Sequence, residues 1–195
     1  MNSPGLRERK KRKTRWAIQD HALRLFAEQG YEATTVDQIA AAAEISPSTF
    51  FRYFKTKEDL VVEDEYDALL AEGVRTLRPD LEPLAAIREV MRSAFRAMGA
   101  QERAKVLERA KLIMSVPALR ARSMQNFLNT VALVREAAAE RTGRPVTDFE
   151  LRAFAGAVVG ALVGVLEAWI ESGDPDELPD LMDRALAYLG AGLPL

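Results

Sequence analysis

The feature that most constrains the fold is a pair of short segments that begin with helix-capping residues and lie close together in the chain. Thr35 and Gln38 have the T-x-x-Q spacing of a capping box, in which each side chain accepts a hydrogen bond from the backbone of the other residue. Ser46 precedes Pro47, which suits the first position of a helix because the N–H that proline lacks would be unpaired there. Two short helices, the first ending near Glu44 and the second following a turn of about three residues, form the helix-turn-helix pattern.

The second of these helices, PSTFFRYF, has two faces of different chemistry. At about 100° per residue, Phe50 and Phe54 share one side, where we expect them to pack against neighbouring helices. The other side and its edges present hydroxyl, guanidinium and aromatic groups: Pro47, Ser48, Thr49, Phe51, Arg52 and Tyr53. Such groups can enter a major groove, read bases and bind phosphates. A surface helix with no ligand would carry the same caps, so the flanking sequence decides between the two interpretations.

Further helices are predicted on both sides of this motif. A helix over about 6–29 is indicated by apolar residues at helical spacings ahead of Gly30: Trp16, Ala17, Leu23, Phe26 and Ala27. After the motif, Thr56 is placed to cap a helix with Lys57 in its first turn. A cation there opposes the helix macrodipole unless a phosphate binds at the same point, whereas a solvated lysine would have little effect.

Charge is distributed unevenly along the chain. Residues 1–57 contain 11 Lys+Arg against 6 Asp+Glu, a net +5, and residues 58–195 contain 16 against 23, a net −7. A basic first third favours an anionic partner, with nucleic acid or a membrane surface as the leading candidates. The run RERKKRKTR at residues 7–15 could alternatively be a solubilising tail.

Several kinds of active site are excluded or disfavoured. Cysteine is absent, which excludes disulfides, thiolate catalysis and cysteine metal sites and fits a reducing cytoplasm. His21 is the only histidine, which disfavours a di-metal carboxylate site and Ser-His-Asp catalysis. The chain has no glycine-rich phosphate loop, and no apolar run of a secretory signal follows its basic N-terminus. We therefore expect a cytoplasmic protein that is not an enzyme and uses no cofactor or metal.

Residues 7–60, above all ALRLFAEQGYEATTVDQIAAAAEISPSTFFRYFKTKEDL, resemble the DNA-binding domain of the TetR family of one-component transcriptional regulators. The resemblance implies that the first helix packs behind the motif. It implies phosphate contacts from Thr35, Tyr53 and Lys57. It also implies that four residues approach the bases: Pro47, Ser48, Thr49 and Phe51. Phe51 replaces the tyrosine more usual at its position, so apolar contact or packing would replace a hydroxyl contact there.

The rest of the chain is predicted to be helical, giving an all-α protein of about nine helices. A linking helix over about 57–77 ends before Pro79 and Pro83. The next helix has an apolar stripe: Ile87, Met91, Ala94, Phe95 and Met98. Further helices are expected to Ser115, over 117–141, and after a Thr147-to-Glu150 capping box that follows Gly143. The charge distribution indicates a basic, partly flexible arm at 1–15, and the family resemblance implies a helix-turn-helix domain at 7–56 and a ligand-binding and dimerisation domain at 57–195.

The segment AFAGAVVGALVGVLEAWI, residues 153–170, contains a single charged residue, Glu167. It approaches the length of a membrane span, but its marginal length, its internal glutamate and the lack of a second basic flank favour a buried helix. Gly156, Gly160 and Gly164 would let two helices approach closely. We expect this helix, with Leu186 of the last helix, to form a four-helix interface in a two-fold homodimer, as the family resemblance also implies.

An effector site is predicted from methionine and aromatic side chains that suit an adaptable apolar pocket: Met91, Phe95, Met98, Met114, Met124, Phe127 and Leu128. Ordinary core packing would use the same residues. Arg88, Arg92 and Arg96 could meet an anionic ligand or pair with nearby glutamates on a solvated face. The segment RAKLIMSVPALRARSM resembles regulators that sense acyl-coenzyme A-like molecules.

Together these patterns indicate a homodimeric regulator that binds a double-stranded DNA operator and responds to a small effector. We expect a repressor that leaves a palindromic operator when it binds a largely apolar ligand. An activator, or a DNA-binding protein without an effector, is the alternative, and a membrane partner is not expected.

Overall fold

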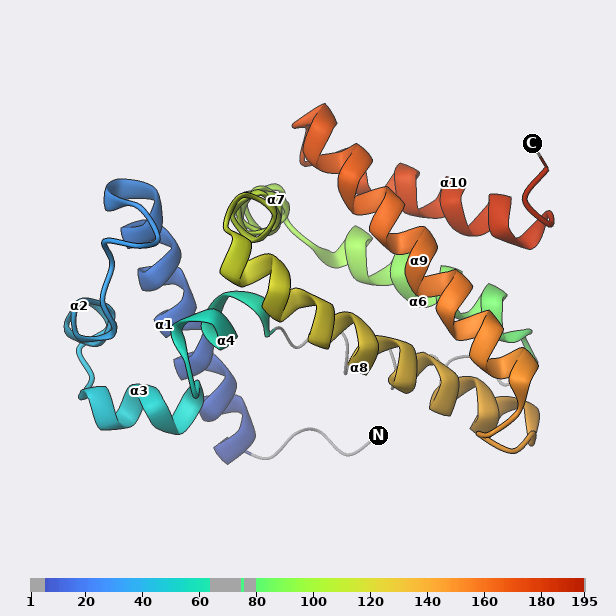
Figure 1. The fold of residues 1–195 in the computed structure, drawn as a ribbon, viewed down its shortest axis with the longest axis horizontal. Helices are drawn as coiled ribbons and strands as arrows, with labels where there is room; N and C mark the ends of the chain where they lie inside the picture. Colours follow the sequence, from blue (N-terminus) through green and yellow to red (C-terminus); the bar gives the residue numbers. More distant parts are fainter. Residues whose placement is uncertain (1–5, 64–74, 76–79, 195) are drawn as a thin grey trace. The chain divides into compact units, whose positions relative to one another are not determined.

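The structure is a computed structural model that describes residues 6–63, 75 and 80–194. In that part of the chain there are nine helices and no strand, which confirms the predicted all-α fold (Figure 1). The first helices are α1 (Leu6–Gln29), α2 (Val36–Ala42), α3 (Pro47–Tyr53) and α4 (Lys57–Val62). They are followed by α6 (Pro83–Ala97), α7 (Ala100–Ser115), α8 (Pro117–Thr142), α9 (Phe149–Ser172) and α10 (Leu178–Gly190).

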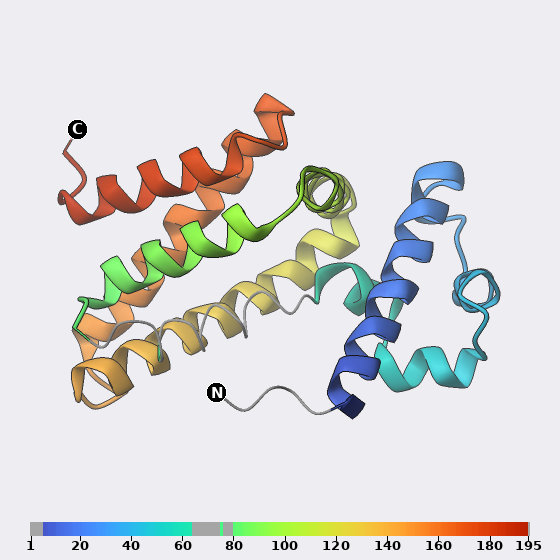
Figure 2. The same ribbon diagram turned by 180° about the vertical axis from the view of Figure 1, so that it is seen from behind.

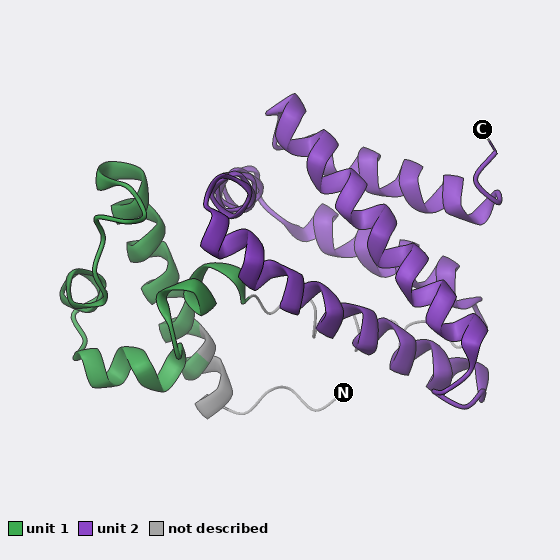
Figure 3. Ribbon diagram, viewed as in Figure 1, with its two compact units in different colours: residues 1–63 green, residues 64–195 purple. Residues whose placement is uncertain are grey.

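The chain divides into two compact units, residues 1–63 and 64–195 (Figure 3). Unit 1 contains α1 to α4, and unit 2 contains α6 to α10. α4, which the sequence analysis assigned to the second domain, packs against α1 within unit 1.

α4 ends at Val62, so the predicted continuous helix over 57–77 is wrong at Glu63, whose backbone is extended (φ −74°, ψ 125°). The cause lies on α1, where the side-chain amide of Gln19 donates to the carbonyl oxygens of Leu60 and Glu63, each at 3.0 Å. In a continuing helix, the Leu60 carbonyl would bond the N–H four residues further on, and the Gln19 amide takes that place. The remainder of the predicted helix lies outside the described residues, except for Arg75.

Unit 1 is built around one apolar face of α1, formed by Ile18, Ala22 and Phe26. These residues recur every four positions, so they stay on one side of the helix. Of the other residues that indicated this helix, Trp16 is 50% exposed, because packing falls on the Ile18 side. The rest of the core comes from α2, α3, α4 and the residue that follows α3: Ile39, Ala40, Phe50, Phe54, Leu60, Val61 and Val62.

Unit 2 is held together by two large clusters of buried apolar side chains that both include α9, and a smaller third cluster joins Ala138 and Ala139 of α8 to Leu151 of α9. The first cluster joins α6, α8, α9 and α10: Ile87, Val134, Ala137, Ala155, Val158, Val159 and Leu186. The second joins the end of α6, α7, α9 and the start of α10: Phe95, Met98, Leu107, Ala110, Val165, Trp169 and Leu178. α9 packs against both α8 and α10 and lies between them in both views (Figures 1 and 2).

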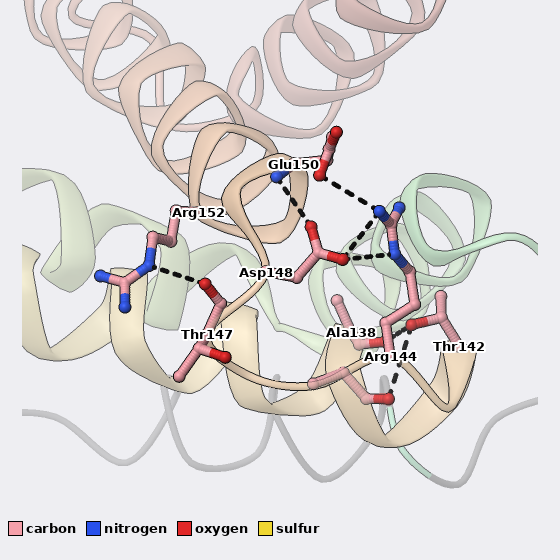
Figure 4. Close-up of polar contacts among 8 residues, drawn as sticks. Ala138, Thr142, Arg144, Thr147, Asp148, Glu150 and Arg152 are labelled. Carbon is pink, nitrogen blue, oxygen red and sulfur yellow. Dashed lines mark hydrogen bonds and ion pairs between the residues drawn. The ribbon is translucent and has the colours of Figure 1, made fainter.

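The turn between α8 and α9 corrects one predicted cap (Figure 4). Gly143 ends α8 in the left-handed conformation (φ 69°), as expected for a C-terminal glycine. The N-cap of α9 is Asp148 rather than Thr147, and its Oδ1 accepts a hydrogen bond from the Glu150 N–H at 2.9 Å. Asp148 Oδ2 is also bonded to the guanidinium of Arg144 at 2.8 and 2.7 Å. The carboxylate has two oxygens for these two partners and a negative charge that pairs with Arg144, and the Thr147 hydroxyl has neither.

Candidate functional site

The N-termini of α2 and α3 are capped as the sequence predicts. Thr35 Oγ1 accepts from the Gln38 N–H at 3.2 Å, and Gln38 Oε1 accepts from the Thr35 N–H at 2.8 Å, which confirms the capping box. Ser46 Oγ accepts from the Thr49 N–H at 3.1 Å and donates to Thr49 Oγ1 at 3.0 Å. The Ser48 hydroxyl lies 2.9 Å from Ser46 Oγ. These contacts hold two hydroxyl groups of α3 in place at its exposed first turn.

The two faces of α3 separate as predicted. Phe50 and Phe54 are buried, with ring centres 5.7 Å apart. Phe51 stands edge-on to Phe50, at 5.4 Å between ring centres, yet remains 53% exposed. It therefore both packs and presents half of its ring. The remaining predicted contact residues of α3 are exposed or half-buried: Pro47, Ser48, Thr49, Arg52 and Tyr53.

An arginine that was counted in the basic run is in fact the link between α1, α3 and α4. Arg15 Nη1 donates to the Tyr53 carbonyl at 3.2 Å, and Nη2 pairs with Glu63 Oε2 at 2.9 Å. Its guanidinium carbon lies 4.3 Å from the centre of the Phe54 ring. Arg15 thus fixes the C-terminal end of α3. The sequence signal was its position three residues before Ile18, on the inward face of α1.

Lys57 is half-buried and bonded within unit 1, so the solvated alternative is wrong. Its Nζ donates to the carbonyl oxygens of Tyr31 at 2.8 Å and Thr34 at 3.1 Å. It also lies 4.1 Å from the centre of the Tyr31 ring. These contacts tie the turn that leads into Thr35 to the start of α4. Two of the three ammonium N–H groups are used, which leaves one for a phosphate.

The same turn carries a buried phenol. The Tyr31 hydroxyl donates to Glu58 Oε1 at 2.8 Å. Burial and then the hydrogen bond to the Glu58 carboxylate raise the pKa of Tyr31 well above its usual range. The hydroxyl therefore stays protonated, and it serves as a permanent donor between the α1–α2 turn and α4.

The predicted effector residues do not gather in one place among the described residues. Phe95 and Met98 belong to the second core cluster of unit 2, and Met91 and Phe127 pack partly against core clusters. Met114 is half-buried. Met124 and Leu128 are 61% and 54% exposed. In the predicted α6 stripe, Ala94 is exposed, so the packed face is narrower than the sequence indicated.

The arginines of α6 have a partner that the sequence analysis missed. Arg88 binds Asp183 of α10 through two hydrogen bonds of 2.6 Å, and Arg92 binds the same carboxylate at 2.9 Å. Arg92 also pairs with Glu89 at 3.6 Å, which is the predicted kind of local pair. The two guanidinium groups hold the pKa of Asp183 far below its usual range. Both arginines and Glu89 line an open groove of about 720 Å³ between α6 and α10.

The predicted dimer residues also lie in different settings. Gly160, Gly164 and Glu167 are exposed on α9, and Gly156 is half-buried. No atom lies within 4 Å of where a Cβ would stand on any of these three glycines. Leu186 is only 1% exposed because it packs in the first core cluster of its own chain, so it does not lie on an exposed face of α10. The exposed small-residue face is therefore confined to α9.

α9 is long and apolar enough to cross a membrane by length and composition alone, with a mean hydropathy of 2.0. Only 28% of its most apolar window is buried within the chain. It nevertheless supplies Ala155, Val158, Val159, Val165 and Trp169 to the two core clusters, which identifies it as a core helix.

Two family models account for most of the chain. Residues 18–63 match the model for bacterial regulatory proteins of the tetR family, and residues 81–194 match the model for the MftR C-terminal domain. The chain belongs to the TetR family. The predicted resemblance and the division into a helix-turn-helix region and a helical C-terminal region are thereby confirmed, and the relatives of the chain are transcriptional regulators, not enzymes.

Individual TetR-family proteins extend this result. A Mycobacterium tuberculosis protein named as the mycofactocin biosynthesis transcriptional regulator MftR is 28% identical over 179 residues, 90% of this chain and 89% of that protein. The regulator TcmR of Streptomyces glaucescens is 56% identical over 61 residues, 31% of this chain and 27% of that one. The crystal structure of Thermus thermophilus FadR, a TetR-family repressor in complex with lauroyl-CoA, matches with a TM-score of 0.59 and 26% identity. That match covers 93% of this chain and 95% of FadR.

Proposed function

We propose that the protein is a cytoplasmic, homodimeric repressor that binds a palindromic operator and is released by a small, largely apolar effector. The observation that carries the proposal is the construction of α3. Buried Phe50 and Phe54 hold the helix from behind, while an exposed face of hydroxyl, guanidinium and aromatic groups is available to a major groove.

The contacts to DNA divide into two kinds. Pro47, Ser48, Thr49 and Phe51 approach the bases, where the Thr49 methyl and the exposed half of the Phe51 ring suit a thymine methyl group. Residues around this surface contact the phosphates: Thr35, Arg52, Tyr53 and Lys57. Because Lys57 is held by two carbonyl oxygens, it contributes a single, fixed donor.

The second copy of the chain packs on the exposed face of α9. Gly160 and Gly164 leave room for close approach of a second helix, and an apolar helix with so much exposed surface is stabilised when it is covered. A two-fold axis through this contact presents two copies of α3 to the two halves of a palindrome.

The effector is proposed to be acyl-coenzyme A-like. The FadR structure holds lauroyl-CoA, and the methionine and phenylalanine side chains of α6 and α8 supply apolar surface in the corresponding unit. Arg88 and Arg92 pair with Asp183, and Arg92 also pairs with Glu89, so they do not supply the cations for the ligand phosphates in this conformation. Ligand binding shifts the population toward a dimer in which the two α3 helices no longer match successive major grooves.

The test begins with selection of binding sites from random duplex DNA at near-physiological salt. We expect recovery of a palindrome, and operator titrations with lauroyl-CoA should then show weaker binding than titrations without it. Recovery of no enriched sequence would contradict the proposal as a whole. An operator whose affinity does not change with any acyl-CoA, although calorimetry shows binding, would contradict only the effector mechanism and favour an effector-independent DNA-binding protein.

A further inference from the structure

The inward face of α1 changes from apolar to cationic along the helix. Phe26, Ala22 and Ile18 form its buried stripe, and the same face continues toward the N-terminus as Arg15 and then Lys11. Toward the N-terminus, Arg15 is the last residue of this face that packs against the core of unit 1, and its side chain is 17% exposed. Lys11 stands one turn further on, at the same angle around the helix, and is exposed.

The position of Lys11 relative to α3 follows from the contacts of Arg15. Since Arg15 donates to the Tyr53 carbonyl and covers the Phe54 ring, the inward face of α1 at this level points to the C-terminal end of α3. Lys11 lies roughly 6 Å further along the axis of α1. In Figure 1 the lower end of α1 lies next to the end of α3 that carries Arg52 and Tyr53.

This part of α1 carries a local excess of positive charge. Lys10, Lys11 and Lys13 are exposed, and none forms an ion pair with the residues that the structure describes. Like charges three or four residues apart, such as Lys10 and Lys13 or Lys11 and Arg15, destabilise a helix. Glu8 is the only acidic residue between positions 6 and 19. A polyanion that binds here would offset these unfavourable terms.

We propose that the first turns of α1 are a second DNA-contacting element, in which Lys11 binds a phosphate beside those bound by Arg52 and Tyr53. Lys10, about 100° from Lys11 around the helix, widens the same basic surface, whereas Lys13 lies about 160° from Lys11 and faces the other side of α1. The partner is the phosphate backbone of the operator duplex, because the surface continues the one that α3 presents. These contacts add affinity and carry no base sequence. The inference rests on the proposed operator binding.

The test compares Lys10→Gln/Lys11→Gln with the native protein by fluorescence anisotropy, over a salt series from about 50 to 300 mM. Each lost phosphate contact should lower the slope of log affinity against log salt by roughly 0.9, so a dimer should lose about 2 to 4. Affinity near physiological salt should fall at least about tenfold, and by a similar factor for the operator and for an unrelated duplex of equal length.

The matched control is Lys105→Gln/Lys111→Gln, which removes the same charge from α7 in unit 2 and should leave the slope unchanged. Circular dichroism checks that each variant is folded. An unchanged slope in Lys10→Gln/Lys11→Gln, or an equal loss in the control, would overturn the inference while operator binding stands. Loss of binding to phosphatidylserine vesicles with DNA affinity intact would assign the surface to a membrane instead. If the native protein selects no operator, the proposed function itself fails.

Discussion

The two units of the chain are stabilised by different kinds of interaction. In unit 1, long polar side chains reach backbone carbonyl oxygens on other elements: Arg15 to Tyr53, Gln19 to Leu60 and Glu63, and Lys57 to Tyr31 and Thr34. In unit 2, the two large apolar clusters share α9, and a bond of this kind between distant segments runs from Arg141 to the Leu81 carbonyl at 2.7 Å. A smaller domain buries a smaller share of its surface, so directional hydrogen bonds contribute more to fixing its helices. The polar bonds of unit 1 therefore hold α3 in one position, whereas unit 2 is stabilised mainly by the apolar surface that its helices bury.

The largest expected effect tests the core of the smaller unit. Phe50→Ala removes a fully buried ring and should destabilise unit 1 by about 3–5 kcal/mol. The neighbouring change Phe51→Ala removes a half-exposed ring and should cost about 1 kcal/mol or less. Trp169 lies in the core of unit 2, so in a Trp16→Phe background its near-ultraviolet circular dichroism reports that unit separately. A simultaneous loss of the Trp169 signal in Phe50→Ala would contradict independent stabilisation of the two units.

The next effect concerns the hydrogen bonds and the ion pair that Arg15 forms in unit 1. Arg15→Met keeps the apolar length of the side chain but removes its bonds to Tyr53 and Glu63. The free energy of unfolding of unit 1 should fall by about 1.5–3 kcal/mol. Operator affinity should fall with it, because the end of α3 is no longer fixed. Arg24→Met, on the exposed side of α1, is the control and should change stability by less than about 0.5 kcal/mol. Equal melting temperatures for the two variants would refute the role assigned to Arg15.

A smaller effect is expected from Gly160→Leu, which separates dimerisation from folding. No atom of the chain lies within 4 Å of the added Cβ, and leucine favours a helix over glycine by about 0.8–1 kcal/mol, so the single chain should be as stable as before or more so. The dissociation constant of the dimer should rise at least about tenfold, because the leucine side chain would push the two α9 helices apart. Light scattering over a concentration series measures this. A Gly160→Leu protein that remains dimeric would place the interface elsewhere.

The smallest effect concerns the ion pairs of unit 2. Because the pKa of Asp183 is lowered by Arg88 and Arg92, its contribution to stability is present above the usual aspartate pKa and is lost as the pH falls through and below that range. At neutral pH, Asp183→Asn should cost about 1 kcal/mol or less, since these side chains are more than a third exposed. The difference between variant and native protein in urea unfolding should vanish in strong acid. A difference that does not depend on pH would contradict the assignment.

Much of unit 1 could be predicted because its signals are local. The Thr35–Gln38 capping box, the Ser46 cap and the Phe50 and Phe54 pair each depend on residues within four positions of one another, and the structure contains all of them. The bounds predicted for α1 match as well. Local hydrogen bonds and helical periodicity do not need the rest of the fold, so the sequence is sufficient for them.

The errors arose where a residue's partner is distant in the chain. The helix predicted to continue past Val62 stops there because Gln19, 41 and 44 residues away from its two acceptors, binds the Leu60 and Glu63 carbonyls. Leu186 was assigned to a dimer interface because it lies in the last helix, but its neighbours in the core come from α6, α8 and α9.

The sequence by itself determined the all-helical class, the helix-turn-helix and the membership of a family of regulators, since these follow from spacing and from a contiguous motif. Only the tertiary structure decided which cationic side chains are bonded to oxygen atoms of the chain and which remain exposed. Arg15, Lys57, Arg88 and Arg92 are held by carbonyl or carboxylate oxygens, up to 95 residues away for Arg88, whereas Lys10, Lys11 and Lys13 remain exposed. The physical reason is that the sequence shows which residues are charged, whereas the distance from each charge to its partner, and so the strength of the pairing, depends on the fold.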